Sequence, residues 1–220
     1  MDVTQCHQSF PYYRPMPRWE AGAQARLTQA AYELYFERGF DSVTVAEITA
    51  RAGLTKRTFF RYFADKREVL FSGAAAFQEA AVDAVVNAEE GVTPIDAVVD
   101  ALAAGGSAIT EIGEGARGRQ RLIETSTELQ EREMIKMVAL TRAIDDALQR
   151  RGVPESVASI TAQAGVAVFQ TAFERWARQD APDEFSHLIY STLDELRAAV
   201  HPAVPDGSGA ARRATTTRDR

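Results

Sequence analysis

The sequence predicts an all-α fold of about nine helices, in which a small three-helix unit precedes a longer helical bundle. Apolar residues recur at spacings of three and four along most of the chain, and no segment alternates apolar and polar residues as a strand does. Proline, glycine and threonine stand where helices are expected to begin and end. Two short amphipathic segments between positions 44 and 63 flank a glycine turn, which indicates a helix–turn–helix.

The two ends of the chain differ in composition from the segments between them. Three prolines interrupt any helix in residues 1–17, so we expect a flexible N-terminal arm there. Residues 201–220 are rich in proline, glycine, alanine, threonine and arginine, which predicts a disordered tail. The expected folded domains are therefore residues 18–65 and residues 66–200.

Charge divides the chain in the same way. The 220 residues carry a formal net charge of −6, but residues 1–70 carry +2 and residues 71–200 carry −10. Screening at physiological salt acts over about 8 Å, so a locally cationic surface attracts phosphates despite the acidic total. Cys6 is the single cysteine, which excludes an internal disulfide. With no long apolar run, we expect a cytoplasmic protein without a membrane partner.

The first predicted helix runs from about Arg18 to Arg38, because its apolar residues repeat every three to four positions and Gly39 can end it. Thr44 is a good N-cap for the second helix, and Glu47, three residues on, completes a capping box. Gly53 can then adopt the left-handed backbone that a sharp turn requires.

The helix after this turn carries the most informative chemistry. Thr55 can cap it, and we expect it to run from Lys56 to Phe63, anchored by apolar residues four apart on one face. Six lysines and arginines fall between positions 51 and 67, against one acid, Asp65. A protruding cationic helix of this kind suits the major groove of DNA. Asp65 with Glu68 repeats the capping-box pattern and is expected to begin the next helix.

A set of residues between about Arg26 and Leu70 occurs in a characteristic order: Ala31, Gly39-Phe40, Thr44 to Ile48, Ala52-Gly53-Leu54, Phe60 to Phe63 and Lys66. In this order they resemble the DNA-binding domain of the TetR/AcrR family of bacterial transcriptional regulators. The resemblance implies a homodimeric repressor that binds a palindromic double-stranded DNA operator and is released by a small apolar effector.

Side-chain chemistry and the resemblance together predict the DNA contacts. Lys56 and Arg57 are expected at base edges, and Tyr62, like Thr44 and Lys66, at phosphates. Position 60 holds phenylalanine where the family usually has tyrosine, which removes one hydroxyl. The full expected DNA-binding set is Thr44, Thr55, Lys56, Arg57, Thr58, Phe60, Arg61, Tyr62 and Lys66.

The remaining helices follow from the same periodicity. The family resemblance implies that the first of them tilts when an effector binds. Gly105 and Gly106 mark a kink or a close approach of another element. The expected bounds are Lys66–Asn87, Pro94–Ile112, Ala116–Ile123, Thr125–Arg150, Pro154–Gln179 and Pro182–Val200.

Two functions are expected of the second domain. Methionine and aromatic residues suit an adaptable apolar effector pocket, lined by Phe77, Leu102, Ile109, Met134, Met137, Phe169, Phe173 and Trp176. The last two helices are apolar over a broad stripe and would pair across a two-fold axis, through Val157, Ile160, Phe185, Leu188, Ile189, Leu193 and Leu196. The segment Leu129–Trp176 further resembles actinobacterial regulators of the mycofactocin-system type, which implies an acyl-coenzyme A-like effector.

Enzyme chemistry is not expected. The histidines are His7, His187 and His201, none of them beside a second metal ligand, and no glycine-rich phosphate loop follows a strand. We therefore predict no catalytic residue, metal site or cofactor. Three alternatives stay open: an all-α protein–protein adaptor without specific DNA binding, activation instead of repression, and an arm whose arginines reach DNA or only flank the first helix.

Overall fold

The computed structural model describes residues 21–111, 113–179 and 184–200, and over these ranges the chain forms nine α-helices and one short 3₁₀ helix without any strand. The all-α prediction is confirmed. The predicted arm and tail, with Cys6, His7 and His201, lie outside the described residues. The elements are α1 Ala21–Arg38, α2 Val45–Ala52, α3 Lys56–Tyr62, η1 Arg67–Val69, α4 Ala74–Val86, α5 Pro94–Thr110, α6 Glu114–Glu124, α7 Thr127–Arg150, α8 Glu155–Arg178 and α9 Phe185–Val200.

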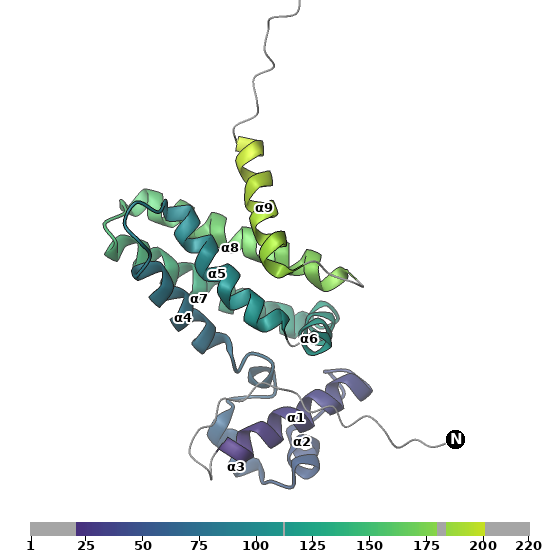
Figure 1. Cartoon of the computed structure of the whole chain (residues 1–220). Helices are drawn as coiled ribbons and strands as arrows, with labels where there is room; N and C mark the ends of the chain where they lie inside the picture. Colours follow the sequence, from purple (N-terminus) through teal and green to yellow (C-terminus); the bar gives the residue numbers. More distant parts are fainter. Residues whose placement is uncertain (1–20, 112, 180–183, 201–220) are drawn as a thin grey trace, which may run out of the picture.

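Two lobes are stacked along one axis (Figure 1). The N-terminal lobe consists of α1, α2, α3 and η1, and the C-terminal lobe of α4 to α9. In the N-terminal lobe, α1 packs against both short helices and ends at Gly39, whose φ of 78° is the left-handed backbone predicted there. Leu27, Ile48 and Phe59 are fully buried between these helices, so the predicted apolar anchors form the core of this lobe.

The predicted helix Lys66–Asn87 is wrong in its first eight residues. The Asp65 carboxylate accepts hydrogen bonds from the N–H groups of Arg67 and Glu68, at 2.8 and 3.2 Å, and starts a 3₁₀ turn instead of an α-helix. Val69, Leu70 and Phe71 are then all buried in the core of the N-terminal lobe, which also includes residues of α6 and α7. The α-helix begins only at Ala74.

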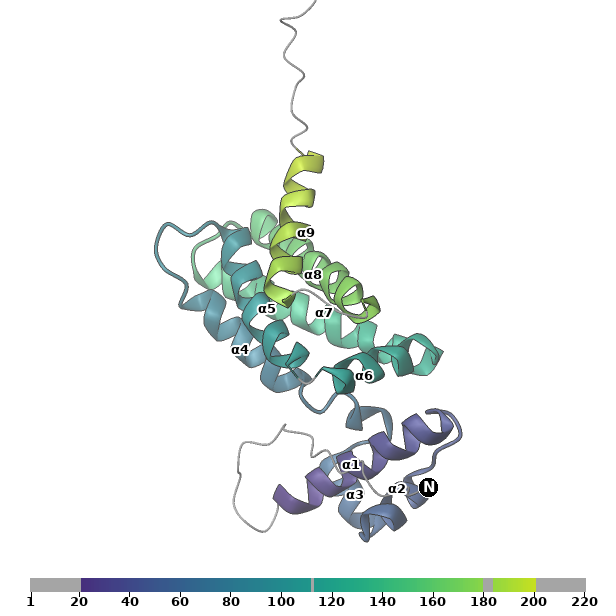
Figure 2. The ribbon, with the colours of Figure 1, turned by 45° about the vertical axis from the view of Figure 1, so that its right-hand side comes forward.

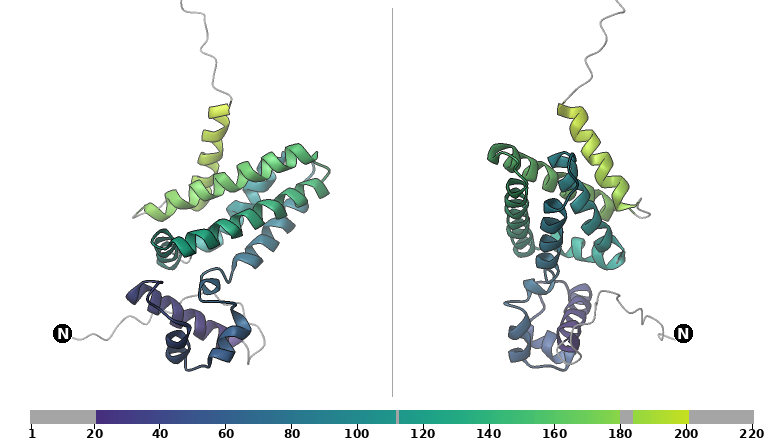
Figure 3. Two further views of the ribbon diagram at one scale, coloured as in Figure 1. Left: turned by 180° about the vertical axis from the view of Figure 1, so that it is seen from behind. Right: turned by 60° about the vertical axis from the view of Figure 1, so that its left-hand side comes forward.

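The C-terminal lobe is a bundle built around α5, which packs against α4, α8 and α9. Helices α7 and α8 lie side by side and antiparallel, joined by a short turn at Gly152 with a φ of 83° (Figure 3). Helix α9 crosses α5 and α8 on the other side of the bundle (Figure 2). No described helix combines the length and the apolar character needed to cross a membrane.

Glycines on α5 allow aromatic rings to approach its backbone, as the sequence predicted. A Cβ atom at Gly105 would lie 2.5 Å from the ring of Phe77, and one at Gly106 would lie 2.1 Å from the ring of Phe185. Real Cβ atoms do not come so close to carbon, so these positions exclude larger residues unless the rings move. Helix bounds elsewhere lie within a few residues of those predicted, although Ile112 and residues 180–183 lie outside the described residues.

Candidate nucleic-acid interface

Helix α2 begins with a complete capping box. The Thr44 hydroxyl accepts the Glu47 N–H at 3.3 Å, and the Glu47 carboxylate accepts the Thr44 N–H at 2.8 Å. Arg38 forms an ion pair with the same carboxylate at 2.9 Å. The hydrogen bonds from Thr44, followed by that from Arg38, lower the pKa of Glu47 to about 2. The cap therefore stays ionised at physiological pH, and α2 starts at a fixed residue.

The turn between α2 and α3 has the backbone that the sequence predicted. Gly53 has a φ of 63° and a ψ of 38°, and its N–H bonds back to carbonyls of the last turn of α2. The guanidinium of Arg26 on α1 donates to the Ala52 carbonyl and fixes the turn against α1. Thr55 then caps α3, because its hydroxyl accepts the Thr58 N–H at 3.2 Å.

Helix α3 presents cations outward from a buried base. Phe59 and Phe63 are buried, whereas the side chains of Lys56, Arg57 and Arg61 are exposed. Among the described residues, neither Lys56 nor Arg57 forms an ion pair. Their charges are therefore available to a polyanion, as predicted for the reading helix of a helix–turn–helix.

The aromatic residues of α3 complete this surface. Phe60 is 57% exposed and lies edge-on to Phe59, so its apolar ring faces outward without a hydroxyl. Arg61 donates a hydrogen bond to the Tyr62 hydroxyl at 2.8 Å and lies over the Tyr62 ring, 4.8 Å from its centre. This contact orients the guanidinium along the outer side of the helix.

Two of the other cations in this region are neutralised. Arg51 pairs with Glu33 at 3.3 Å and with Glu37 at 2.9 Å, both on α1. The hydrogen bond from Arg51 lowers the pKa of Glu37. Arg67 pairs with Asp65 at 2.5 Å. These two cations hold α2 and η1 in place and add little to the outward-facing charge.

Lys66 requires a correction. Its ammonium donates to the carbonyls of Phe40 at 3.0 Å, Asp41 at 3.4 Å and Val43 at 3.1 Å, and it lies 4.1 Å from the centre of the Phe40 ring. Three donors meet three acceptors, so a phosphate contact would require at least one of these bonds to break. In this structure Lys66 closes the loop between α1 and α2.

The predicted threonines are also occupied within the helix–turn–helix. The Thr44 hydroxyl both accepts from the Glu47 N–H and donates to the Glu47 carboxylate, at 2.8 Å, which leaves no hydroxyl proton for the predicted phosphate contact. The Thr55 and Thr58 hydroxyls bond to each other at 3.0 Å. Thr44 thus caps α2, and Thr55 with Thr58 caps α3. Thr44 and Thr55 are exposed, as are Lys56, Arg57, Phe60 and Arg61, whereas Thr58, Tyr62 and Lys66 are half-buried.

The contact between the lobes was not predicted from the sequence. Leu122, Ile123 and Leu129, from the corner between α6 and α7, are buried in the hydrophobic core of the N-terminal lobe. Apolar periodicity can show that a helix has a buried face but not which lobe covers it, because this depends on the relative placement of distant helices.

Glu68 adds a polar contact at the same junction. Its carboxylate pairs with Lys136 at 3.1 Å and with Arg132, both on α7. Burial alone would raise the pKa of Glu68, but the hydrogen bonds from Arg132 and Lys136 outweigh it and hold the pKa below its ordinary value. Glu68 therefore links the end of the DNA-binding unit to the C-terminal lobe, and it does not complete the capping box predicted with Asp65.

The predicted effector-pocket residues are packed core or surface in this structure. The rings of Phe77, Phe169, Phe173 and Trp176 contact one another, with neighbouring centroids 5.4 to 6.0 Å apart. Leu102 is fully buried, and Ile109 and Met137 pack against the same core. Met134 is 66% exposed, so its prediction as a lining residue is wrong. A cavity at this place would require the rings to move.

Most of the predicted dimer contacts are likewise internal. Phe185, Leu188, Ile189 and Leu193 are buried within a single chain, so these four predictions are wrong. Leu196 is partly buried against the same core, and its place in an interface stays a prediction. Two of the predicted residues are exposed: Val157 is 46% and Ile160 70% exposed. Helix periodicity marked an apolar stripe but could not tell the protomer's own core from an interface.

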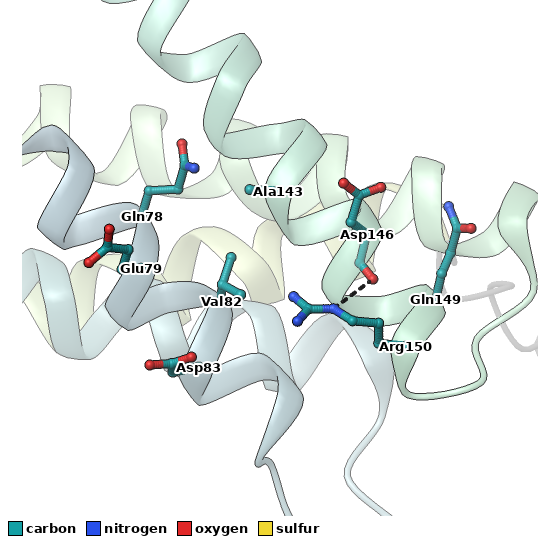
Figure 4. Close-up of a pocket in the computed structure, with 8 residues that line it drawn as sticks. All are labelled: Gln78, Glu79, Val82, Asp83, Ala143, Asp146, Gln149 and Arg150. Carbon is teal, nitrogen blue, oxygen red and sulfur yellow. Dashed lines mark hydrogen bonds between the residues drawn. The ribbon is translucent and has the colours of Figure 1, made fainter.

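One open surface groove lies between α4 and α7 (Figure 4). Glu79, Asp83 and Asp146 line it, and Arg150 turns its guanidinium toward the Asp146 carbonyl, at 3.4 Å. None of the predicted pocket residues lines this groove. Over the described ranges, no group of three or more histidines, cysteines and carboxylates is arranged to hold a metal ion.

Two family models match the chain. The model for bacterial regulatory proteins of the tetR family matches residues 27–72, and the model for the MftR C-terminal domain matches residues 92–201, which is half of the chain. The first match covers the helix–turn–helix and the second covers α5 to α9.

Individual relatives agree with this assignment. The transcriptional regulator TcmR of Streptomyces glaucescens is 34% identical over 79 residues, which is 36% of this chain but only 35% of TcmR. A Mycobacterium tuberculosis protein assigned as the mycofactocin biosynthesis regulator MftR is 26% identical over 178 residues, 78% of this chain and 88% of that protein.

A solved structure shares the fold. NalD of Pseudomonas aeruginosa, the secondary repressor of a multidrug efflux pump, superposes with a TM-score of 0.59 at 16% identity, over 81% of this chain and 96% of NalD. Its two-lobed all-α architecture matches the one described above. The helix–turn–helix, the two family models and these relatives agree. The chain therefore belongs to the TetR family of transcriptional regulators, which are DNA-binding proteins and not enzymes.

Proposed function

We propose that this TetR-family regulator is a homodimeric repressor that binds a palindromic operator and is released by an apolar effector. DNA binding is supported by the difference between paired and unpaired cations around α3. Arg51, Lys66 and Arg67 are bound by carboxylates or carbonyls, whereas Lys56 and Arg57 project from a capped, anchored helix. A helix held rigidly with free cations on its outer face is suited to the major groove.

The residue types on α3 suggest distinct roles at the DNA. Arg57 near the N-terminus of the helix can bond bidentately to guanine, and Lys56 can reach a neighbouring base or phosphate. The exposed ring of Phe60 can contact a thymine methyl group or a sugar, in place of the phosphate bond that a tyrosine would make. Arg61, oriented by Tyr62, can reach a backbone phosphate.

Dimerisation is proposed through the outer face of α8. Val157 and Ile160 are the exposed residues of the predicted set, and Ala164 and Ala167 continue along the same side of the helix. The proposal requires a two-fold axis that puts both copies of α3 on one side of the duplex, with half-sites about 34 Å apart. Ile160→Glu should then give monomers that lose operator binding. Ile135→Glu, at an exposed position of α7, is the matched control and should stay dimeric.

The proposed effector opens the aromatic cluster of the C-terminal lobe. In this cluster Phe77, Phe169, Phe173 and Trp176 pack on one another, with Met137 and Ile109 against the same core, and such side chains can repack around an apolar ligand. We propose an acyl-coenzyme A-like effector, which the resemblance of Leu129–Trp176 to regulators of the mycofactocin-system type implies. Such a ligand releases DNA only if it binds the non-DNA-binding state more tightly, by about 1.4 kcal/mol for each tenfold loss of DNA affinity.

Repression is favoured over activation by the likeness to NalD, although both modes use the same parts. An adaptor without DNA binding would leave the free cations of α3 unexplained. A chromosomal regulator acts where the chromosome is, so we place this one in the cytoplasm.

The deciding experiment is selection of DNA fragments by the purified protein, followed by fluorescence anisotropy on the selected site. Arg57→Ala should weaken specific binding by about 1–3 kcal/mol and leave binding to random DNA nearly unchanged. Arg51→Ala is the matched control, because its charge is already paired. Equal losses on specific and random DNA for Arg57→Ala would contradict base reading, and failure to select any sequence would contradict the proposal as a whole.

A further inference from the structure

We infer that Arg26, on α1, is a further DNA-contacting residue, which binds a backbone phosphate beside the turn between α2 and α3. The inference rests on the proposed DNA binding and adds to it a contact from a helix outside the helix–turn–helix. The predicted DNA-binding set starts at Thr44 and does not include Arg26. Sequence neighbours gave no reason to include it, because the turn that it contacts lies 26 residues further along the chain.

The guanidinium of Arg26 lies against the α2–α3 turn. Its Nη2 donates a hydrogen bond to the carbonyl of Ala52, the last residue of α2. A Cβ atom at Gly53 would lie 2.9 Å from the same nitrogen, so the guanidinium also lies against the Gly53 backbone. Successive Cα atoms are about 3.8 Å apart, which places the Lys56 Cα within about 11 Å of the Gly53 Cα. The Arg26 charge is therefore held close to the cations of α3.

The first half of α1 lies at the same end of the molecule as the reading helix. Helix α1 packs against α3, and the first turns of α1 lie beside α3 at the end of the molecule farthest from α9 (Figures 1 and 2). A duplex that takes up α3 in its major groove therefore passes close to this part of α1.

Arg26 also carries a charge that no carboxylate neutralises in the described part of the chain. The side chain is exposed and uses one of its five N–H groups in the bond to Ala52. The carboxylates of the N-terminal lobe all have other partners: Glu33 and Glu37 bind Arg51, Asp41 binds Ser126, Glu47 binds Arg38, Asp65 binds Arg67, and Glu68 binds Lys136. The other N–H groups of Arg26 are therefore available to a phosphate.

An arginine held in this way suits a phosphate better than a base. Guanidinium groups bind phosphate oxygens through two parallel N–H groups, and the single bond to Ala52 leaves enough N–H groups for such a pair. The same bond restricts the side chain before DNA binds, so less conformational entropy is lost on binding. Helix α1 flanks the reading helix, and contacts from flanking elements to the DNA backbone fix the register without reading sequence.

The test is the salt dependence of DNA binding, measured by fluorescence anisotropy on a random-sequence duplex and on the selected site. Each phosphate contact contributes about 0.9 to the slope of log affinity against log salt concentration, so Arg26→Met should lower the slope by about 0.9 for each bound protomer on both duplexes. Between about 50 and 200 mM salt, the unchanged protein should therefore lose about three- to fourfold more affinity per protomer than this variant. Arg26→Lys keeps the charge and should restore the slope.

Two comparisons separate a phosphate contact from a purely structural role. If Arg26 only holds the turn, Arg26→Met weakens binding to the selected site but keeps the salt slope of the unchanged protein on random DNA, and this result overturns the inference. Arg142→Met removes an exposed arginine of α7 and is the matched control for net charge. A slope that Arg142→Met lowers equally, or that Arg26→Lys does not restore, also overturns it. If the unchanged protein shows no salt-dependent DNA binding, the proposed function fails together with this inference.

Discussion

The two lobes differ in the range of the contacts that fix their functional surfaces. In the N-terminal lobe, each helix of the helix–turn–helix starts from a hydrogen bond between residues three apart, Thr44 with Glu47 and Thr55 with Thr58. In the C-terminal lobe, the helices are joined across about one hundred residues, as where the Tyr190 hydroxyl meets Asp100 at 2.8 Å. Local chemistry therefore decides what α3 presents, whereas packing between distant segments decides what α8 and α9 present.

The most destabilising substitution proposed tests whether the two lobes unfold as one unit. Leu129 of α7 is fully buried in the core of the N-terminal lobe, so Leu129→Ala should lower the free energy of unfolding by about 2–5 kcal/mol. Urea unfolding followed by fluorescence and by circular dichroism should still show one common transition, because the two lobes share this core.

Val138→Ala on the same helix is the control for this substitution. Its side chain is 46% exposed, and the change should stay within about 0.5 kcal/mol. Two separated transitions in the Leu129 variant would show that the lobes unfold independently. The lobes would then be two separate domains and would not share one core.

The next effect concerns the ionic contact between the lobes. Glu68→Gln leaves Arg132 and Lys136 half-buried without their carboxylate, so the free energy of unfolding should fall by about 1–3 kcal/mol. Glu131→Gln, at an exposed position of α7, should change it little.

The same contact has a predictable pH dependence. The pKa of Glu68 is lower in the folded state than in the unfolded chain, so the carboxylate stabilises the fold above its unfolded pKa and loses this contribution as the pH falls through its folded pKa. The difference in stability between the original protein and Glu68→Gln should be constant near neutral pH and shrink below about pH 4. A difference that does not change with acidification would count against Glu68 as the titrating group.

The sequence predicted the features that depend on local contacts and failed for those that depend on contacts between distant segments. The caps at Thr44 and Thr55 and the turn at Gly53 were all predicted, because each depends on residues within one helical turn. The predicted α-helical start at Lys66 was wrong, because residues 69 to 71 are buried between the two lobes. The spacing of apolar residues along one helix cannot show such a contact. Phe185 and Leu193 were assigned to an interface because an apolar stripe looks the same whether its own chain or a second copy covers it.

A matched pair of cap substitutions tests whether local hydrogen bonds alone set the position of α3. Thr55 caps α3 and Thr93 caps α5 by the same side-chain bond, at 3.2 and 3.3 Å. Each threonine-to-alanine change should lower stability by about 1 kcal/mol. Only Thr55→Ala should also weaken operator binding, because it loosens the helix that carries Lys56 and Arg57, and anisotropy titrations would show this. A comparable loss of DNA affinity from Thr93→Ala would mean that the C-terminal lobe sets the position of α3.

The smallest effect separates cations that face DNA from cations that hold the fold. Each phosphate contact contributes about 0.9 to the slope of log affinity against log salt concentration, so Arg61→Gln should reduce the slope by about one contact. Arg51→Gln should leave the slope unchanged, because Glu33 and Glu37 already bind that guanidinium. The free energy of unfolding should fall by no more than about 1 kcal/mol, as for other exposed pairs.

Lys66→Met, which removes three carbonyl contacts, should lower the free energy of unfolding without changing the slope. If the slope falls in the Lys66 variant but not in the Arg61 variant, the loop lysine leaves its carbonyls when DNA binds, and the boundary drawn here between positioning and contacting cations would have to be reversed.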